Sequence, residues 1–147
     1  MQQKTVACLV ENIKKFKSTT KTRIDAIAIR GNSGAIMGGI VSYLLGIPLF
    51  CIRKKESSHS VMKIEGYFNK SRGTINYIII DDLISTGETM DAIMDSLDEL
   101  VQDHFLLSMY KFKPKAIFLY NQPQKSAGKE FYHDDINTPI IAFQLDH

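Results

Sequence analysis

The 147-residue chain is predicted to form one α/β domain, in which helices flank a central and mainly parallel sheet. Short apolar runs rich in β-branched residues alternate with segments of helical periodicity, as in repeated strand–helix units. These runs are continuously apolar, which is typical of parallel strands buried on both faces. No repeat, low-complexity tract or linker interrupts residues 1–147, so we expect a single domain.

The first half of the chain supplies two helices and two strands. Residues 3–16 carry apolar side chains at helical spacing with lysines on the other side. The run 25–30 is apolar and β-branched, and we expect Ser33 to cap a helix over 34–45. A second buried strand is expected at 49–53, directly after a Gly-Ile-Pro turn.

The second half repeats the alternation. The clearest strand is 77–80, and further strands are expected at 116–120 and 139–145. Between the first two lies a helix of about twenty residues. Its apolar stripe consists of Met90, Ile93, Met94, Leu97, Leu100 and Val101.

The composition excludes several classes of protein. The chain is 44% apolar and 23% charged, as in an ordinary globular domain, and its net charge of +2 gives no support for nucleic-acid binding. Cys8 and Cys51 form neither a CxxC motif nor a disulfide framework. The apolar stretches are too short for a membrane span, and the N-terminus does not resemble a signal peptide. We therefore expect a soluble, cytoplasmic protein that does not bind membranes.

The segment 77–89 carries the strongest chemical signal. Its strand delivers two adjacent carboxylates, Asp81 and Asp82, which repel each other unless a cation or hydroxyl donors offset their charge. A turn of small and hydroxyl residues then opens the long helix, where exposed N–H groups and the helix dipole favour a phosphate. Strand ends next to helix N-termini are where parallel sheets bind ligands.

The segment 77–89 has three other possible interpretations. Each residue taken alone is best explained as a strand end or a helix cap. A nucleotide P-loop is a poor match, because no GxxxxGK[ST] pattern occurs. A phospho-acceptor receiver domain also clusters carboxylates, but Asp25 stands at the start of its strand, which is the wrong end.

The whole string 77–89 resembles the signature with which type I phosphoribosyltransferases bind phosphoribosyl pyrophosphate (PRPP). The resemblance implies their Rossmann-like fold, with a small hood and a flexible loop. It also implies that Asp81 and Asp82 are catalytic and hold the ribose hydroxyls, with or through Mg²⁺. The expected 5′-phosphate loop is Ser85, Thr86, Gly87, Glu88 and Thr89.

The resemblance extends upstream. Residues 27–34 are similar to the family's pyrophosphate loop, which implies that Arg30, Gly31 and Asn32 bind pyrophosphate. The Arg-Lys-Lys string that ends the second strand resembles the corresponding stretch of adenine phosphoribosyltransferases. There, Arg53 and Lys55 would contact pyrophosphate and stabilise its departure.

The remaining expectations concern the acceptor base. The family places its flexible catalytic loop at about 54–75, and a hood here would come from the N-terminal helix or from 121–147. Base-binding residues are not identified, although Tyr120, Phe131 and Tyr132 are candidates for stacking. Hypoxanthine-guanine enzymes usually carry an aspartate at the Ser85 position, so its absence favours adenine or orotate.

The implied activity is therefore Mg²⁺-dependent transfer of ribose 5-phosphate from PRPP to a nucleobase, with release of pyrophosphate, in nucleotide salvage. The family also implies a homodimer. The alternative is a regulatory protein of the same fold, which binds PRPP or a nucleotide without turnover.

Overall fold

The structure, a computed structural model, describes residues 2–53, 64–66, 73–103, 109–121 and 129–143. Within these ranges, a mixed sheet has the strand order β3-β2-β1-β4-β5-β7-β6. The strands are β1 Ala26–Ile29, β2 Leu49–Ile52, β3 Ile64–Gly66, β4 Thr74–Asp81, β5 Lys111–Leu119, β6 Glu130–His133 and β7 Ile136–Ala142. The five inner strands are parallel, while β3 and β6 pair antiparallel at the two edges. This arrangement confirms the predicted α/β class.

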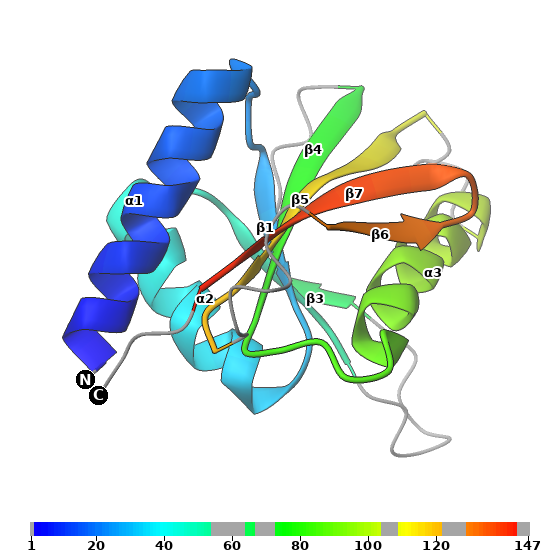
Figure 1. Cartoon of the computed structure of the whole chain (residues 1–147). Helices are drawn as coiled ribbons and strands as arrows, with labels where there is room; N and C mark the ends of the chain where they lie inside the picture. The colour runs from blue at the N-terminus through cyan, green and yellow to red at the C-terminus, as the bar shows by residue number, and fades with distance from the viewer. Residues whose placement is uncertain (1, 54–63, 67–72, 104–108, 122–128, 144–147) are drawn as a thin grey trace.

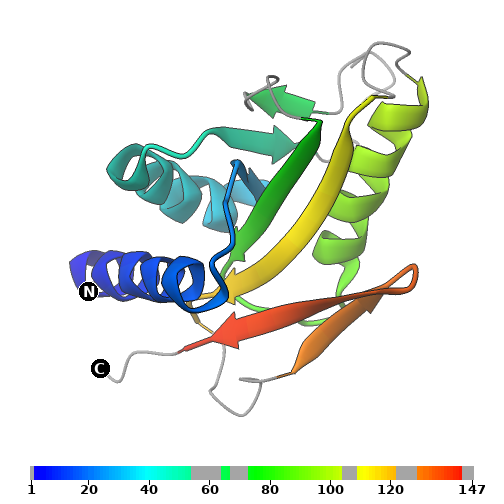
Figure 2. The same ribbon diagram turned by 90° about the horizontal axis from the view of Figure 1, so that it is seen from above.

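Helices cover both faces of the sheet (Figures 1 and 2). Helices α1 (Gln2–Thr20) and α2 (Gly31–Leu45) pack on one face, and α3 (Glu88–Asp103) packs on the other. Alternate side chains of β4 pack against the helices on opposite faces of the sheet. Ile78 and Ile80 join the cluster under α1 and α2, whereas Tyr77 and Ile79 join the cluster under α3. Burial on both faces explains why these strands are continuously apolar.

Helix α2 lies unusually close to the sheet because its inner face carries glycines. A Cβ atom added to Gly34 would lie 2.8 Å from the carbonyl oxygen of Ile80, and one added to Gly38 would lie 2.6 Å from Ile29. This packing brings the first turn of α2 beside the carboxyl ends of β1 and β4.

The start of α2 differs from the prediction. The helix begins at Gly31, Arg30 is its extended N-cap residue, and no side chain caps it. Ser33 is therefore not the cap and lies inside the first turn. Gly31 has a φ of 83°, and this left-handed conformation lets the chain leave β1 and enter the helix directly.

Part of the segment expected as a loop at 54–75 is a strand. β3 pairs with β2, and Gly66 faces Phe50 with a φ of 125°. A Cβ atom at Gly66 would lie closer than contact distance to the backbone of β2, so this pairing requires glycine. Residues 54–63 and 67–72 lie outside the described part of the chain.

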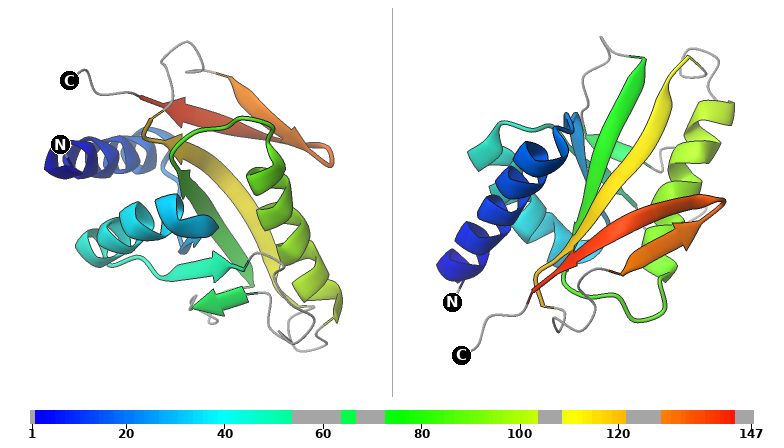
Figure 3. Two further views of the ribbon diagram at one scale, coloured as in Figure 1. Left: turned by 90° about the horizontal axis from the view of Figure 1, so that it is seen from below. Right: turned by 45° about the horizontal axis from the view of Figure 1, so that its top comes forward.

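A hairpin of β6 and β7 completes the sheet, and β6 was not predicted. Asp134 and Asp135 form its two-residue turn with φ values of 43° and 65°, the pattern of a type I′ turn. An Asp-Asp pair is a weaker turn signal than Asn-Gly. Figure 3 shows the hairpin reaching past β5 to lie beside α3. Among the described helices, none combines the length and the hydropathy needed to cross a membrane.

Candidate active site

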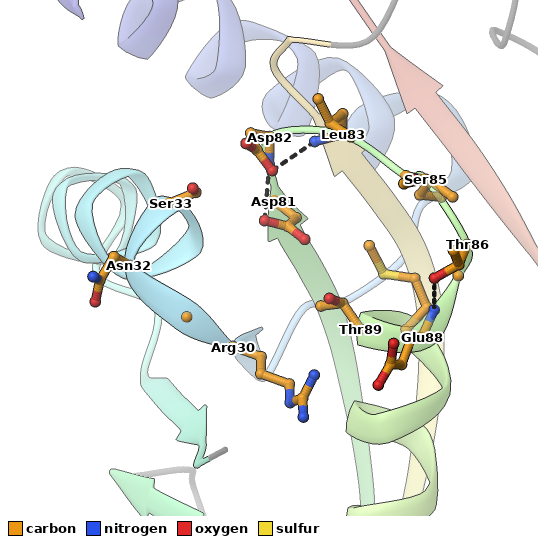
Figure 4. Close-up of a pocket in the computed structure, with 14 residues that line it drawn as sticks. Arg30, Asn32, Ser33, Asp81, Asp82, Leu83, Ser85, Thr86, Glu88 and Thr89 are labelled. Carbon is orange, nitrogen blue, oxygen red and sulfur yellow. Dashed lines mark hydrogen bonds between the residues drawn. The ribbon is translucent and has the colours of Figure 1, made fainter. Parts of the chain in front are cut away.

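A hollow of about 260 Å³ opens at the carboxyl ends of β1 and β4 (Figure 4). Two segments far apart in the sequence form its wall, namely 30–33 at the start of α2 and 81–90, which runs from the end of β4 through the turn into α3. The lining residues are Arg30, Gly31, Asn32, Ser33, Asp81, Asp82, Leu83, Ile84, Ser85, Thr86, Gly87, Glu88, Thr89 and Met90.

The end of β4 presents the two adjacent carboxylates. Asp81 is only 7% exposed, and its Oδ1 accepts a hydrogen bond of 2.9 Å from the N–H of Asp82. Asp82 Oδ1 accepts one of 2.8 Å from the N–H of Leu83. Their backbone carbonyls accept the N–H groups of Tyr120 and Asn121, so β5 holds this strand end in place. The carboxylates are thus fixed by local backbone bonds.

The turn into α3 forms the opposite side of the hollow. The Oγ1 of Thr86 accepts a hydrogen bond of 3.3 Å from the N–H of Glu88, and the carbonyl of Gly87 receives the N–H of Asp91. Gly87 is buried, has a φ of 82°, and would place a Cβ atom 2.9 Å from the ring of Phe131. The first N–H groups of a helix lack intrahelical partners, so this turn offers donors to an anion.

The start of α2 adds a cation and a second helix N-terminus. Arg30 lines the hollow, and its Nε is buried without a hydrogen-bond partner among the described residues. A buried donor without a partner is costly, so an anion bound here would relieve it. The side chain of Asn32 points away from the carboxylates, which leaves mainly its backbone to the hollow (Figure 4).

Proteins of similar sequence match a large part of this chain. The "HGPRTase-like protein 2" of Natrialba magadii is 30% identical over 123 residues, which cover 76% of this chain and 68% of that protein. The chain belongs to the type I phosphoribosyltransferase family. The "HGPRTase-like protein 1" of Haloquadratum walsbyi is 31% identical over 98 residues, or 60% of this chain. The match spans only 52% of the Haloquadratum protein, about half its length. No family model matches the chain.

Solved structures of phosphoribosyltransferases share the fold. The adenine phosphoribosyltransferase of Saccharomyces cerevisiae, complexed with adenine and an imino-altritol bisphosphate, superposes with a TM-score of 0.59 and 17% identity. That match covers 93% of this chain and 77% of the yeast chain. The purine phosphoribosyltransferase of Pyrococcus horikoshii gives a TM-score of 0.51 at 18% identity, covering 97% and 82% of the two chains.

The phosphoribosyltransferase fold brings together most of the residues singled out from the sequence. Arg30, Gly31, Asn32, Asp81, Asp82 and all of 85–89 line one hollow. Arg53 does not line it, and its Nη1 lies 3.1 Å from Oε1 of Glu65 on β3. Lys55 lies outside the described residues.

Three further aromatic candidates have structural contacts. Phe131 packs against Gly87, and the hydroxyl of Tyr132 donates a hydrogen bond to Asp135. The Tyr120 hydroxyl donates to the backbone of Ser33, so it joins β5 to α2. No local pattern around Tyr120 or Phe131 indicates these partners, because each lies far away in the sequence.

Asp25 has the structural role that its position at the amino end of β1 implied. It accepts two hydrogen bonds from Arg23 and one from the N–H of Asn76, at the opposite end of the sheet from the hollow. A receiver-type acidic site would need it at the other end.

Proposed function

We propose that this protein is a phosphoribosyltransferase that transfers ribose 5-phosphate from PRPP to a nitrogenous base and releases pyrophosphate. One observation carries the proposal: the carboxylate pair Asp81–Asp82 lies in one hollow with two helix N-termini and Arg30. PRPP needs these features, because its ribose carries a 5′-phosphate at one end, a pyrophosphate at the other and a 2′,3′-diol between them.

The two helix starts suit the two ends of PRPP. We assign the 5′-phosphate to the turn 85–89, where backbone donors and hydroxyls face the hollow at the start of α3. The pyrophosphate would then lie against Gly31 and Arg30, whose buried Nε lacks a partner among the described residues. Both sites use the positive end of a helix dipole.

The donor set at the end of β4 fits Mg²⁺. Asp81 and Asp82 offer only oxygen ligands, which Mg²⁺ prefers, and Mg²⁺ is commonly held by one or two carboxylates together with substrate oxygens. In that arrangement Asp81 and Asp82 would hold the ion through PRPP or water, and the ion would neutralise charge on the departing pyrophosphate.

The reaction is a displacement at the anomeric carbon of the ribose. A base nitrogen forms the new C–N bond as the C–O bond to pyrophosphate breaks, and the electron pair of that bond leaves with pyrophosphate. The base loses its N–H proton to the solvent. The carbon gains positive charge as that bond lengthens, so Asp81 and Asp82 stabilise it while they orient the diol. Arg30 stabilises the leaving group by charge and hydrogen bonding. The chain's contribution is therefore mainly positioning and electrostatics.

We propose a purine as the acceptor base. Named relatives include a "Hypoxanthine/guanine phosphoribosyltransferase" of Methanosphaerula palustris, 30% identical over 91 residues, and the yeast adenine enzyme shares the fold. The preference for adenine or orotate rests on Ser85, which lies exposed at the rim where hypoxanthine-guanine enzymes usually have an aspartate. The sequence relatives and Ser85 therefore favour different bases.

The test measures pyrophosphate release with PRPP and Mg²⁺ across adenine, hypoxanthine, guanine, xanthine and orotate. Release that depends on one purine supports the proposal and identifies the acceptor, whereas release with orotate alone refutes the purine assignment. Silence with every base, together with thermal stabilisation by PRPP, would instead identify a sensor. Silence in both assays would contradict PRPP binding at this hollow.

The sensor is a second candidate because of Arg53. This cation was expected to serve the leaving pyrophosphate, yet it pairs with Glu65 at the sheet edge and does not line the hollow. A protein that binds PRPP without turnover needs the phosphate sites and the carboxylate pair but no further cation.

We also propose a cytoplasmic homodimer, as is usual in the family. The dimer is supported by a row of exposed apolar residues on the outer face of α2, namely Ile36, Ile40, Tyr43 and Leu44. A contiguous apolar surface of this kind is typical of an interface.

A further inference from the structure

A second cluster of ionisable side chains lies between α3 and the β6–β7 hairpin. Asp91, Asp95 and Asp98 follow one another at i, i+4 and i+7, so they share one face of the helix. The β6–β7 hairpin lies beside α3 (Figure 3). His133 contacts Asp91 and Asp95 on that face, and Asp134 lies close to Asp95 and Asp98. None of these residues lines the hollow.

His133 is the centre of the cluster. Its side chain is only 10% exposed, and its Nδ1 lies 2.9 Å from Oδ1 of Asp91, within hydrogen-bond distance. Its Nε2 lies 3.0 Å from Asp95 Oδ1 and 3.3 Å from Asp134 Oδ2. Neither contact has the alignment of a hydrogen bond, and Nε2 has no hydrogen-bond partner among the described residues. The buried Nε2 of His133 therefore lies close to two carboxylate oxygens, neither of which is aligned for a hydrogen bond with it.

Four ligand atoms converge here. One donor atom from each of Asp95, Asp98, His133 and Asp134 lies within 4.8 Å of all the others. Ligands placed about 2.0 Å from a tetrahedral zinc ion are roughly 3.3 Å apart, so small side-chain rotations suffice. The Asp91 contact completes a familiar arrangement, in which a carboxylate holds one ring nitrogen so that the other presents its lone pair.

An ion pair without a metal is the simpler explanation of the cluster. A protonated ring would satisfy Asp91, but it would leave its buried Nε2–H without an aligned acceptor. A metal cation bound to Nε2 would give that nitrogen a partner, and its charge would also neutralise the repulsion between the neighbouring carboxylates.

We propose that Asp95, Asp98, His133 and Asp134 bind one divalent transition-metal ion of the Zn²⁺ type, with Asp91 as a positioning residue. An imidazole among carboxylates suits Zn²⁺ and its neighbours, whereas Mg²⁺ and Ca²⁺ prefer oxygen ligands alone. The ion would fasten the hairpin to α3 and so hold Phe131 against Gly87 of the phosphate loop. This proposal does not depend on the transferase activity.

The experiment uses metal-free full-length protein, titrated with Co²⁺ and followed by visible absorption, with Zn²⁺ as competitor and millimolar Mg²⁺ present throughout. We expect one ion per chain, with a raised melting temperature. Asp98→Asn and His133→Gln should each weaken binding at least about tenfold, and Asp91→Asn should weaken it by about tenfold to a hundredfold. Asp82→Asn is the matched control, and it should bind the ion as the unaltered protein does.

Two results would overturn the proposal. Failure of the unaltered protein to bind Co²⁺ or Zn²⁺ would mean that the cluster is only an ion pair. Binding that survives Asp98→Asn and His133→Gln but is lost in Asp82→Asn would place the ion in the hollow instead. If His133→Gln does not fold, Asp98→Asn decides, because that carboxylate is exposed.

Discussion

The hydroxyl of Tyr120 donates a hydrogen bond of 2.9 Å to the backbone carbonyl of Ser33. This bond joins the end of β5 to the first turn of α2, two segments that flank the candidate active site. The N–H of Tyr120 also donates to the carbonyl of Asp81, so this one residue touches both α2 and the strand of the carboxylates. The relative position of two walls of the hollow therefore depends on Tyr120.

Tyr120→Phe should lower the free energy of unfolding by about 1 kcal/mol, because it removes one partly exposed hydrogen bond. Burial, with the charges of Asp82 and Asp81, raises the pKa of the Tyr120 hydroxyl. A folded pKa above the unfolded value means that the stabilisation is complete below the unfolded pKa and is lost as pH rises through the folded one. Urea denaturation at neutral and alkaline pH should therefore show a smaller difference between the two proteins at alkaline pH. A difference that grows with pH would contradict this.

Asp82→Asn should lower kcat/KM on the order of a hundredfold while the melting temperature stays nearly unchanged. The amide oxygen of asparagine can still accept the N–H of Leu83, so the turn keeps its hydrogen bond. The substitution removes only the charge that Asp82 would present to the proposed ribose and Mg²⁺. Steady-state kinetics and thermal melting measure the two effects, and unchanged turnover would refute the proposed role of Asp82.

Gly87→Ala should weaken PRPP binding and destabilise the fold, because alanine at a φ of 82° is strained by roughly 1–2 kcal/mol and its Cβ meets the Phe131 ring. Gly39→Ala is the matched control. Its Cβ would have no atom within 4 Å, so on the helix it should stabilise by about 0.5–1 kcal/mol. Calorimetry of both variants, with and without PRPP, separates strain in the turn 85–89 from a general effect of alanine.

Arg30→Ala should raise the dissociation constant for PRPP by about tenfold or more, since a hydrogen bond to a charged group contributes about 1.5–3 kcal/mol. Arg53→Ala should have a smaller effect, because Arg53 forms an exposed ion pair with Glu65 outside the hollow. Titration calorimetry with PRPP compares the two directly. Equal losses would mean that Arg53 reaches the ligand in the bound state.

Tyr43→Lys should convert the proposed dimer to a monomer, because it puts a charge into the exposed apolar row of α2, where Tyr43 is 87% exposed. Met109→Lys is the control, as Met109 is 82% exposed but lies away from that row. Sedimentation velocity reports both masses. A monomeric unaltered protein would refute the interface.

The elements of the fold were largely predictable because local patterns carry them. The continuous apolar run 77–80 and the stripe of α3 indicate a strand and a helix without reference to the rest of the chain. β3 and β6 were missed for the opposite reason. Ile64–Gly66 is a strand only because β2 lies beside it, and Glu130–His133 only because Asp134 and Asp135 turn it onto β7.

The candidate site likewise has a part that could be predicted from the sequence and a part that could not. Asp81, Asp82 and the turn 85–89 are adjacent in sequence, so their chemistry was visible in one string. The sequence did not show which cation lies beside these residues, because Arg30 and Arg53 both stand at strand ends and both were predicted to bind pyrophosphate. Only the tertiary structure shows Arg30 in the hollow and Arg53 paired at the sheet edge.

Sequence alone determined the α/β class, the order of the inner elements and the residues of the turn 85–89, because each depends on periodicity or on neighbours in the chain. Tertiary structure decided the contacts between Tyr120 and Ser33, between Phe131 and Gly87, and between His133 and the aspartates of α3. These pairs are separated by tens of residues, and the packing of α2 and of the hairpin against the rest of the fold brings them together. Contacts of this kind leave no local pattern, since a side chain's partner across a fold is set by the packing of whole elements.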